Sequence, residues 1–263
     1  MVRQLYEDSY GTNRRIIMKL EICCGSYQDC LAAQKGGASR IELNSALYLG
    51  GLTPNAATVK LAKANGVTLP IVCMVRPRAA GFHYNEDEVA EMFAQAKDLL
   101  DAGSDGLAFG FLTNDAKIDV ELTKKMVDLI HSYQAEAVFH RAFDCVSNEK
   151  AAIETLIELG VDRILTSGLY PTAIEGKGCI KELVKEYGDR MQILAGSGIK
   201  PANVADFVAE TGVGQVHSSA KTWFIDPTTT APHCSYAYHE ANDYDGVDVE
   251  IVKNLVKELK LGE

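Results

Sequence analysis

The sequence lacks the features of a membrane or secreted protein. It has no run of 18 or more apolar residues, so it predicts no membrane-spanning helix. Its first residues, MVRQLYEDSYGTNRR, are polar and charged, without the apolar segment of a signal peptide. The 7 cysteines are an odd number, scattered along the chain without CxxC spacing, which argues against a disulfide framework. We therefore expect a reducing compartment and a cytoplasmic location.

Positive charge is also scarce. The chain has 26 Lys and Arg against 36 Asp and Glu, which gives a formal net charge of −10. Such a surface repels phosphate backbones and anionic lipid headgroups. We therefore expect no nucleic acid and no membrane as partners.

A repeated pattern of segments runs through the chain. In five places a helical pattern is followed by a glycine, a small or acidic residue and a short apolar run: KGGASRIEL, DAGSDGLAFG, ELGVDRILTSG, EYGDRMQILAGSG and ETGVGQVHSS. The glycine is typical of a helix end, and the apolar run of a buried strand in a parallel sheet. In all, the sequence predicts eight strands, at 19–24, 40–44, 70–76, 106–112, 136–143, 163–167, 191–196 and 215–219.

Strands that alternate with helices indicate an α/β fold with a parallel sheet. Eight such units in 263 residues predict a single (β/α)₈ TIM barrel, and a doubly wound open sheet is the alternative. We expect 1–17 to be a flexible N-terminal extension and 18–263 to form one domain. The segment 221–246 is interpreted as a long loop or flap, which a final amphipathic helix at 247–260 follows.

Alternation along the strands predicts which side chains enter the barrel. The Val-, Ile- and Leu-rich face should contact the helices, and the opposite face should point inward. Strand 136–143 leaves His140 and Arg141 as alternatives, and we favour His140. The predicted interior then contains Glu21, Cys23, Glu42, Asn44, Met74, Arg76, His140 and His217.

This polar set is unusual, because branched aliphatic residues normally fill barrel interiors and active sites lie at the C-terminal ends of the strands. Glutamates beside an arginine and histidines are typical of acid–base chemistry. The alternative is a buried ion-pair network, for example Glu42 with Arg76, that only fixes strand register. The candidate catalytic residues are Glu21, Glu42, Arg76, His140, Asp144 and His217.

The turns after the last three strands are rich in glycine and serine. Barrels often bind phosphate with the loops after strands 7 and 8, where glycines allow backbone amides to approach an anion. The alternative is that these glycines only make tight turns. The candidate anion-binding residues are Ser167, Gly168, Gly196, Ser197, Gly198, Ser218 and Ser219.

A metal site is the third possibility that the interior raises. Cu(I) prefers thiolate and thioether ligands, and Cys23 and Met74 are both expected to point inward. The neighbouring Cys23 and Cys24 face opposite ways on a strand, so they do not chelate one ion together. No local motif indicates a closed metal site, and Cys23 is the single candidate ligand.

Longer motifs resemble a known family. The segments EICCGS (21–26), GGASRIELNSALYLGGLTP (36–54), VCMVRPRAAGFHY (72–84), DGLAFGFLTNDAKID (105–119), FHRAFD (139–144), RILTSG (163–168), ILAGSGI (193–199) and VHSSA (216–220) are similar to the CutC copper-homeostasis family. The resemblance covers about residues 19–224. It implies a cytoplasmic (β/α)₈ barrel that forms homodimers or higher homo-oligomers and is linked to Cu(I). It also implies cysteine ligands in the first two strand motifs; Cys23 matches the first, and Asn44 stands at the second.

The resemblance does not imply an enzymatic reaction, so whether the chain is an enzyme stays open. One hypothesis is a copper-homeostasis protein that binds Cu(I) through Cys23. A second is an enzyme that performs acid–base chemistry on a small anionic compound, phosphorylated or a carbohydrate. A third is an oligomeric scaffold without a small ligand.

Overall fold

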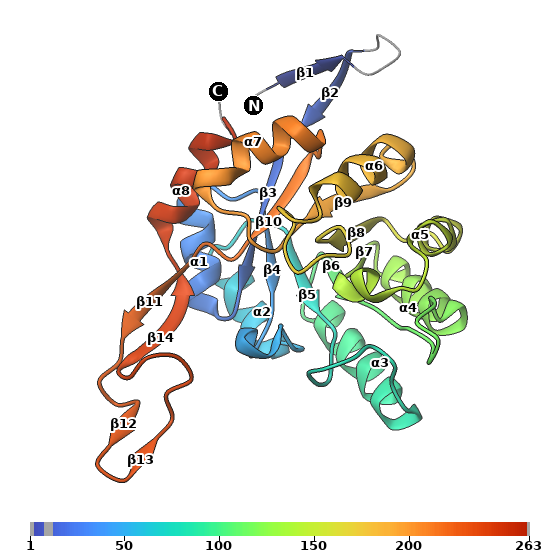
Figure 1. Ribbon diagram of the computed structural model, residues 1–263. Helices are drawn as coiled ribbons and strands as arrows, with labels where there is room; N and C mark the ends of the chain where they lie inside the picture. Colours follow the sequence, from blue (N-terminus) through green and yellow to red (C-terminus); the bar gives the residue numbers. More distant parts are fainter. Residues whose placement is uncertain (1–2, 8–12, 262–263) are drawn as a thin grey trace.

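The computed structural model describes residues 3–7 and 13–261, with side chains from Met18 onward. Within these residues, eight parallel strands close into a barrel in which each strand pairs with the next (Figure 1). The barrel closes where the last of them pairs with the first. The strands are β3 (Lys19–Cys24), β4 (Arg40–Leu43), β5 (Ile71–Met74), β6 (Gly106–Phe109), β7 (Glu136–Phe139), β8 (Arg163–Thr166), β9 (Gln192–Ala195) and β10 (Gln215–Ser218).

Helices surround the barrel, and the predicted (β/α)₈ architecture is confirmed. They are α1 (Tyr27–Gly36), α2 (Ala56–Ala64), α3 (Glu86–Asp101), α4 (Val120–Ser132), α5 (Glu149–Glu158), α6 (Lys177–Tyr187), α7 (Pro201–Thr211) and α8 (Val249–Glu258). Two short 3₁₀ helices are η1 (Leu47–Leu49) and η2 (Arg141–Cys145). Among the described residues, no helix has both the length and the apolar character needed to cross a bilayer.

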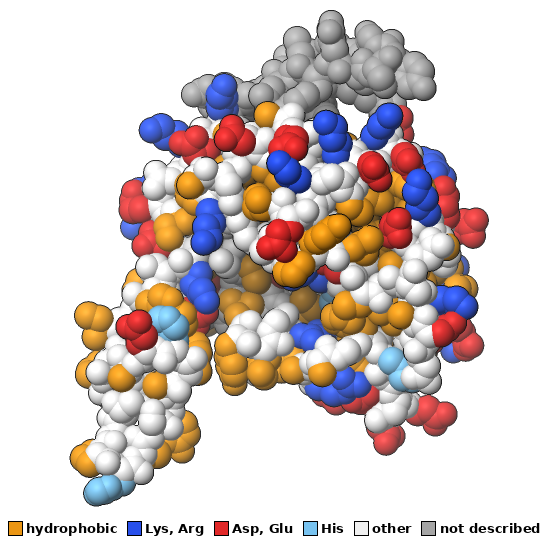
Figure 2. Space-filling model, in the orientation of Figure 1, with side chains coloured by type: hydrophobic (Ala, Val, Ile, Leu, Met, Phe, Trp, Pro, Cys, Tyr) orange, Lys and Arg blue, Asp and Glu red, His pale blue; other side chains and the backbone are white. Residues whose placement is uncertain are grey.

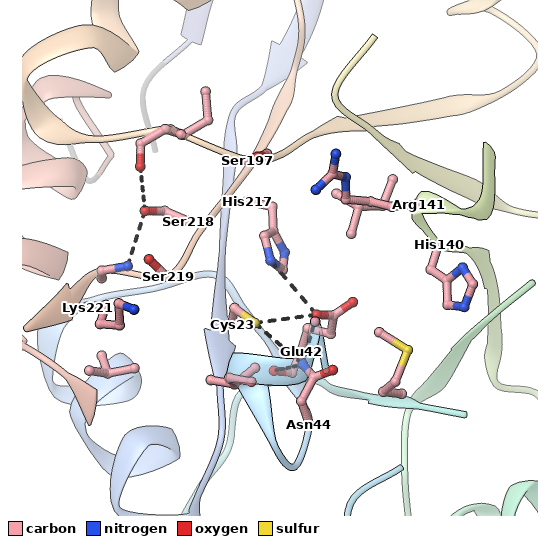
Figure 3. Close-up of a pocket in the computed structure, with 18 of the residues that line it drawn as sticks. Cys23, Glu42, Asn44, His140, Arg141, Ser197, His217, Ser218, Ser219 and Lys221 are labelled. Carbon is pink, nitrogen blue, oxygen red and sulfur yellow. Dashed lines mark hydrogen bonds and ion pairs between the residues drawn. The ribbon is translucent and has the colours of Figure 1, made fainter. Parts of the chain in front are cut away.

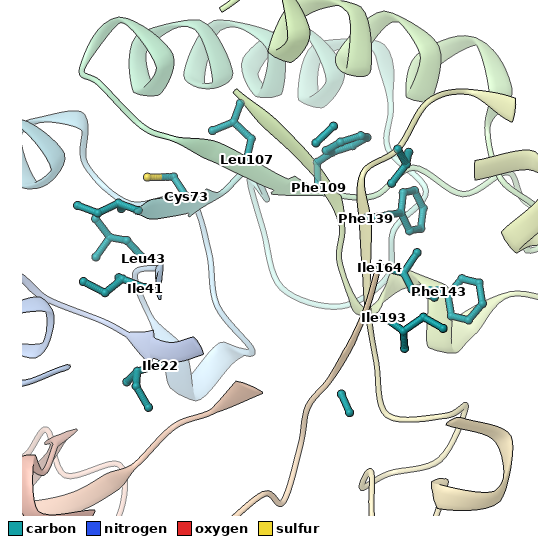
Figure 4. Close-up of a cluster of buried hydrophobic side chains, with 14 of the residues drawn as sticks. Ile22, Ile41, Leu43, Cys73, Leu107, Phe109, Phe139, Phe143, Ile164 and Ile193 are labelled. Atoms are coloured by element: carbon teal, nitrogen blue, oxygen red, sulfur yellow. The ribbon is translucent and has the colours of Figure 1, made fainter. Parts of the chain in front are cut away.

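The main hydrophobic core lies between the strands and the helices. The outward faces of the strands carry the branched and aromatic residues that alternation predicted, such as Ile22, Ile41, Leu107 and Phe109 (Figure 4). Burying such a side chain contributes about 1.5–3 kcal/mol. Because this core takes one face of every strand, the opposite faces are left for the interior of the barrel.

Most predicted strands end one or more residues earlier than expected, and the difference is largest in two of them. The segments 106–112 and 136–143 continue an apolar pattern, but β6 and β7 stop at Phe109 and Phe139. After β7 the chain turns into η2, because the His140 side chain accepts a hydrogen bond from the Ala142 amide and caps that helix. This turn brings His140 and Arg141 to the mouth of the barrel.

The segment after β10 is more regular than the predicted loop. It contains β11 (Lys221–Ile225) paired with β14 (Asp243–Val247), and β12 (Thr230–Ala231) paired with β13 (Cys234–Ser235). Aromatic residues such as Trp223, Phe224 and Tyr244 favour strands once two such segments can pair. We call residues 221–247 the arm, which extends away from the barrel (Figure 1).

Asp29 of α1 attaches the arm to the barrel. Its carboxylate accepts hydrogen bonds from the Val247 amide (2.8 Å), at the end of the arm, and from the Gly25 amide (2.9 Å), just after β3. At the other end of the chain, β1 (Arg3–Glu7) pairs with β2 (Asn13–Ile17). Residues 1–2 and 8–12 lie outside the described residues, so the flexible extension over 1–17 stays a prediction.

Candidate functional site

A cavity of about 930 Å³ opens at the C-terminal ends of the strands. Figure 2 shows a recess between the barrel and the arm on this side of the molecule. Most of the predicted site residues line the cavity: Cys23, Glu42, Asn44, Met74, Arg76, His140, Asp144, Ser197, Gly198, His217, Ser218 and Ser219. Four predicted residues do not line it: Glu21, Ser167, Gly168 and Gly196.

His217 lies between two buried glutamates. Its Nδ1 is 2.8 Å from Glu21 Oε1, and its Nε2 is 3.8 Å from Glu42 Oε2. Asn44 donates to the same Glu42 oxygen at 2.9 Å, and the Cys23 thiol lies 3.7 Å from it (Figure 3). Strands β3, β4 and β10 are neighbours in the barrel, so alternation alone brings these side chains together.

The two glutamates have opposite electrostatic surroundings. Burial alone would raise the pKa of Glu21, but Arg40, His217 and Arg163 together hold it well below its ordinary value. Burial raises the pKa of Glu42, and the negative charge of Glu21 adds to this effect. Glu21 is therefore a permanent carboxylate, whereas Glu42 takes up a proton more readily than an ordinary glutamate.

His217 holds a proton firmly. Burial alone would lower the pKa of its imidazole, but Glu42, then Cys23 and Glu21, raise that pKa well above its ordinary value. A protonated ring 3.8 Å from a carboxyl group of raised pKa forms a pair that can share one proton. Burial also raises the pKa of the Cys23 thiol, so this cysteine is not a free thiolate.

A layer of charge below this pair was missed by the sequence analysis. Arg40 forms a close ion pair with Glu21, and its other nitrogen donates to Gln215 at 2.9 Å. Arg163 lies 4.0 Å from Glu21 and makes two hydrogen bonds to Glu136, at 2.6 and 2.8 Å. Alternation could have revealed this layer. Arg40 lies two positions before Glu42, and Gln215 lies two positions before His217, so each points to the same side of its strand as a residue that we did assign to the interior.

The opposite side of the interior is apolar. Val72, Met74, Ala108 and Val138, from β5, β6 and β7, form a small cluster of their own. In the layer that contains Glu42, which pairs with Val72, the polar side chains therefore concentrate where β10, β3 and β4 meet.

Arg76 does not pair with Glu42, contrary to the ion-pair network that we considered. Its guanidinium donates to the backbone carbonyls of Leu49 (3.2 Å), Gly51 (3.1 Å) and Ala80 (2.7 Å). These bonds hold the loops after β4 and β5 against the mouth of the barrel, and they leave a buried positive charge beside the cavity.

Asp144 is committed to its neighbours. Its carboxylate accepts from the Ser167 amide and hydroxyl (3.0 and 2.9 Å), the Leu169 amide (3.2 Å) and Arg141 Nε (2.8 Å). The hydroxyl of Thr166 adds a fifth contact, at 2.5 Å. So many partners indicate that Asp144 fixes the loops after β7 and β8 and positions Arg141.

The predicted anion-binding residues divide into two groups. Ser197, Gly198, Ser218 and Ser219 line the cavity, together with Lys200 and Lys221, which we had not predicted. Within the described residues, the amides of Ser197, Gly198 and Ser219 have no protein acceptor, so they are free to bind an anion.

The other group consists of residues used for packing. The single Ser167 hydroxyl proton is shared between two acceptors of the chain itself, the Asp144 carboxylate and the Tyr170 carbonyl. A Cβ at Gly168 would lie 2.3 Å from the Gly176 carbonyl oxygen, and one at Gly196 would lie 2.8 Å from Leu165. These two glycines are required by close contacts of the chain with itself.

One group of side chains has the geometry of a metal site. Ligand atoms of Cys23, Glu42 and His217 all lie within 4.8 Å of one another. Only the sulfur is a soft ligand, and both Cys23 and His217 hold protons that an ion must displace. The donors therefore converge, but the set is less suited to Cu(I) than two thiolates would be.

Comparison with known proteins identifies relatives over most of the chain. The model of the CutC family matches residues 18–222. A CutC family protein of Treponema denticola is 43% identical over 244 residues, which cover 92% of this chain and 98% of that protein. One from Vibrio vulnificus is 45% identical over 204 residues, 78% of this chain and 81% of that protein.

Solved structures show the same likeness. A CutC protein from Streptococcus agalactiae, whose name links it to copper homeostasis, has a TM-score of 0.71 and is 32% identical. The match covers 77% of this chain and 98% of that one. Phosphoribosylanthranilate isomerase from Thermotoga maritima matches with a TM-score of 0.55 at 14% identity, over 92% of this chain and 98% of that one, which shows the fold alone.

Proposed function

The chain belongs to the CutC family, and we propose that it is an enzyme that performs acid–base chemistry on a small anionic compound. The observation that carries the proposal is the buried pair of Glu42 and His217, 3.8 Å apart, at the surface of a 930 Å³ cavity. An ion alone does not need a cavity of this size, which is typical of a small-molecule site. A pair that shares a proton is suited to taking one from a substrate and returning it.

Positive groups around the cavity support an anionic substrate. Arg76 and Lys200 line it without a carboxylate partner among the described residues, although the chain as a whole has a net charge of −10. Arg141 and Lys221 also line it, but Arg141 pairs with Asp144 and Lys221 lies 3.7 Å from Asp245. Near the lysines, Ser197 is held in the left-handed backbone region, with φ of 78°. This conformation is costly for a residue other than glycine, and such strain is found repeatedly at functional sites.

The test is hydrogen exchange with solvent. A panel of phosphorylated sugars is incubated with the protein in D₂O, and deuterium uptake at carbon is followed by NMR. If the protein removes the hydrogen from the carbon next to a carbonyl group, solvent deuterium replaces that hydrogen even when no net product accumulates. We expect exchange for at least one compound, reduced about 10²-fold or more in Glu42→Gln with the fold retained. A panel without exchange, or exchange that survives this substitution, contradicts the proposal.

Cu(I) binding is a second candidate, because Cys23, Glu42 and His217 converge. The chain would then bind copper as cargo, in agreement with the name of the Streptococcus agalactiae relative. Reduced, metal-free protein is titrated with Cu(I) against a chromophoric chelator. This role predicts stoichiometric binding that disappears in Cys23→Ser and weakens as pH falls, because bound protons compete. Cu(I) binding that is unchanged in Cys23→Ser argues against a copper site at these three residues.

The two functions are separable by these variants. Cys23→Ser should leave deuterium exchange in place, since the serine hydroxyl preserves a small polar neighbour for Glu42. A cytoplasmic location, which the free cysteines support, and a homodimer or higher homo-oligomer remain proposals.

A further inference from the structure

His140 has a hydrogen-bond donor without an acceptor. Its Nδ1 accepts a hydrogen bond from the Ala142 amide at 3.1 Å, so the ring proton is on Nε2. That nitrogen is buried and has no partner among the described residues. The ring is also fixed in place: a Cβ at Gly110 would lie 2.6 Å from its Cε1. His140 lines the cavity from the end of β7.

Arg76 presents the matching feature, a buried cation without a counterion. Its side chain is only 6% exposed, and its three acceptors are all neutral carbonyl oxygens. No carboxylate forms an ion pair with it in the part of the chain that the structure describes. Its Nε has no partner either. An isolated buried charge is costly, so this arrangement favours an anion from outside the chain.

The two groups share one aromatic neighbour. The Phe82 ring lies 5.0 Å from the His140 ring and 5.2 Å from the Arg76 guanidinium carbon. Burial, and then the charge of Arg76, lower the pKa of His140 to about 3. The imidazole is therefore neutral at physiological pH, and it remains a donor rather than a general acid or base. The proton-transfer role that the sequence suggested for His140 does not suit this environment.

We propose that His140 and Arg76 form an oxyanion subsite that binds a carboxylate or carbonyl oxygen of the substrate. The inference deepens the proposed function and rests on it. Glu42, as a carboxylate beside the protonated His217, would take the proton from the carbon next to the carbonyl, and the electron pair of the broken C–H bond would move onto the oxygen. A neutral imidazole that donates to this oxygen stabilises the developing charge, and Arg76 supports it.

The other end of the cavity indicates the rest of the substrate. The free amides of Ser197, Gly198 and Ser219, with Lys200 and Lys221, suit a phosphate group. The substrate class is therefore a phosphorylated compound with a carbonyl or carboxylate group at its opposite end.

A series of phosphorylated acids tests this inference by calorimetric titration. The probes are phosphoglycolate, phosphoglycerate, phosphoerythronate and phosphogluconate, each compared with the phosphorylated alcohol of the same length. At one length we expect the acid to bind at least about tenfold more tightly than its alcohol, or about 1.4 kcal/mol. His140→Phe should reduce the affinity for the acid to that for its alcohol, and His140→Gln, which keeps a donor, should restore part of the preference.

The outcomes separate the two proposals. Equal affinities for acids and alcohols at every length overturn the oxyanion subsite, even if inorganic phosphate binds. If inorganic phosphate and every alcohol fail to bind while gluconate binds in a His140-dependent way, the oxyanion subsite is supported. The same result contradicts a phosphate site at the other end of the cavity. Nitrogen NMR of the wild-type imidazole gives a second measurement: we expect a neutral ring protonated at Nε2 from pH 5 to 9, and titration near pH 6.5 refutes the assigned role.

Discussion

Replacing each of the two interior glutamates by glutamine should have very different effects on stability. In Glu21→Gln the variant loses the carboxylate that, alone among the described residues, pairs with both Arg40 and His217, at the place where Arg163 also approaches. In Glu42→Gln it loses a carboxylate whose pKa burial already raises, and the amide can still meet Asn44. The two substitutions are matched in size and chemistry, so their difference reports the environments alone.

The expected magnitude follows from the partners. Removing one member of a buried ion pair costs about 3–5 kcal/mol, because the other charge stays buried without compensation. At 2% exposure Glu21 meets this condition, and we expect that cost for Glu21→Gln. For Glu42→Gln we expect a change within about 1 kcal/mol, since a neutral side chain avoids the cost of burying a charge.

Equilibrium unfolding in urea, followed by circular dichroism, measures both free energies. A change of 3–5 kcal/mol also lowers the melting temperature, by about 6–20 °C for a domain of this size. If Glu21→Gln is as stable as the wild type, the charged layer below the site does not support the barrel as we describe it. If Glu42→Gln is destabilised equally, Glu42 is a structural residue and the proposed enzyme loses its principal group.

Three further predictions concern other parts of the molecule. Gly110→Ala should lower the free energy of unfolding by about 1–3 kcal/mol, because the new Cβ would lie 2.6 Å from His140. The control Gly178→Ala, whose Cβ would have nothing within 4 Å, should be neutral or stabilising. Thermal unfolding of both variants compares the two changes in stability. The fold lowers the pKa of His140 to about 3, below the value near 6.5 of an unfolded chain, so its contribution to stability is complete above pH 6.5 and is lost as pH falls toward 3. Between pH 7.5 and 4.5 the melting temperature should therefore fall less steeply in His140→Gln than in the wild type. Equal slopes contradict this prediction. Asp29→Asn should weaken the hydrogen bond from Val247, 2.8 Å in the structure, and speed proteolytic cleavage within the arm; an unchanged cleavage rate shows that other contacts hold the arm.

The fold and half of the site were predictable because they depend on local periodicity. The repeated glycine and apolar run locate the strands, and alternation within a strand decides which side chains enter the barrel. This is enough for Glu21, Glu42 and His217, whose strands are neighbours. The same rule, applied two residues further back, would also have found Arg40.

Other features depend on contacts between loops, which periodicity does not encode. In the alternative that we considered, Arg76 pairs with a carboxylate, but its partners are carbonyl groups that become available only when the loops after β4 and β5 fold. Gly168 and Gly196 have the composition of an anion-binding turn, yet their lack of a side chain serves close packing. Nothing in a single turn distinguishes these two uses of glycine.

The pairing of the first barrel strand with the last also constrains how the chain is made. Glu21 and His217 are 196 residues apart, and they meet only when β10 docks on β3. During synthesis the N-terminal part of a chain emerges first, and pairings of such long separation form late. Until then Glu21, Glu42 and Cys23 remain accessible to water and to solutes. The candidate site is therefore assembled last, and a chain truncated before β10 would have most of its helices but no such site.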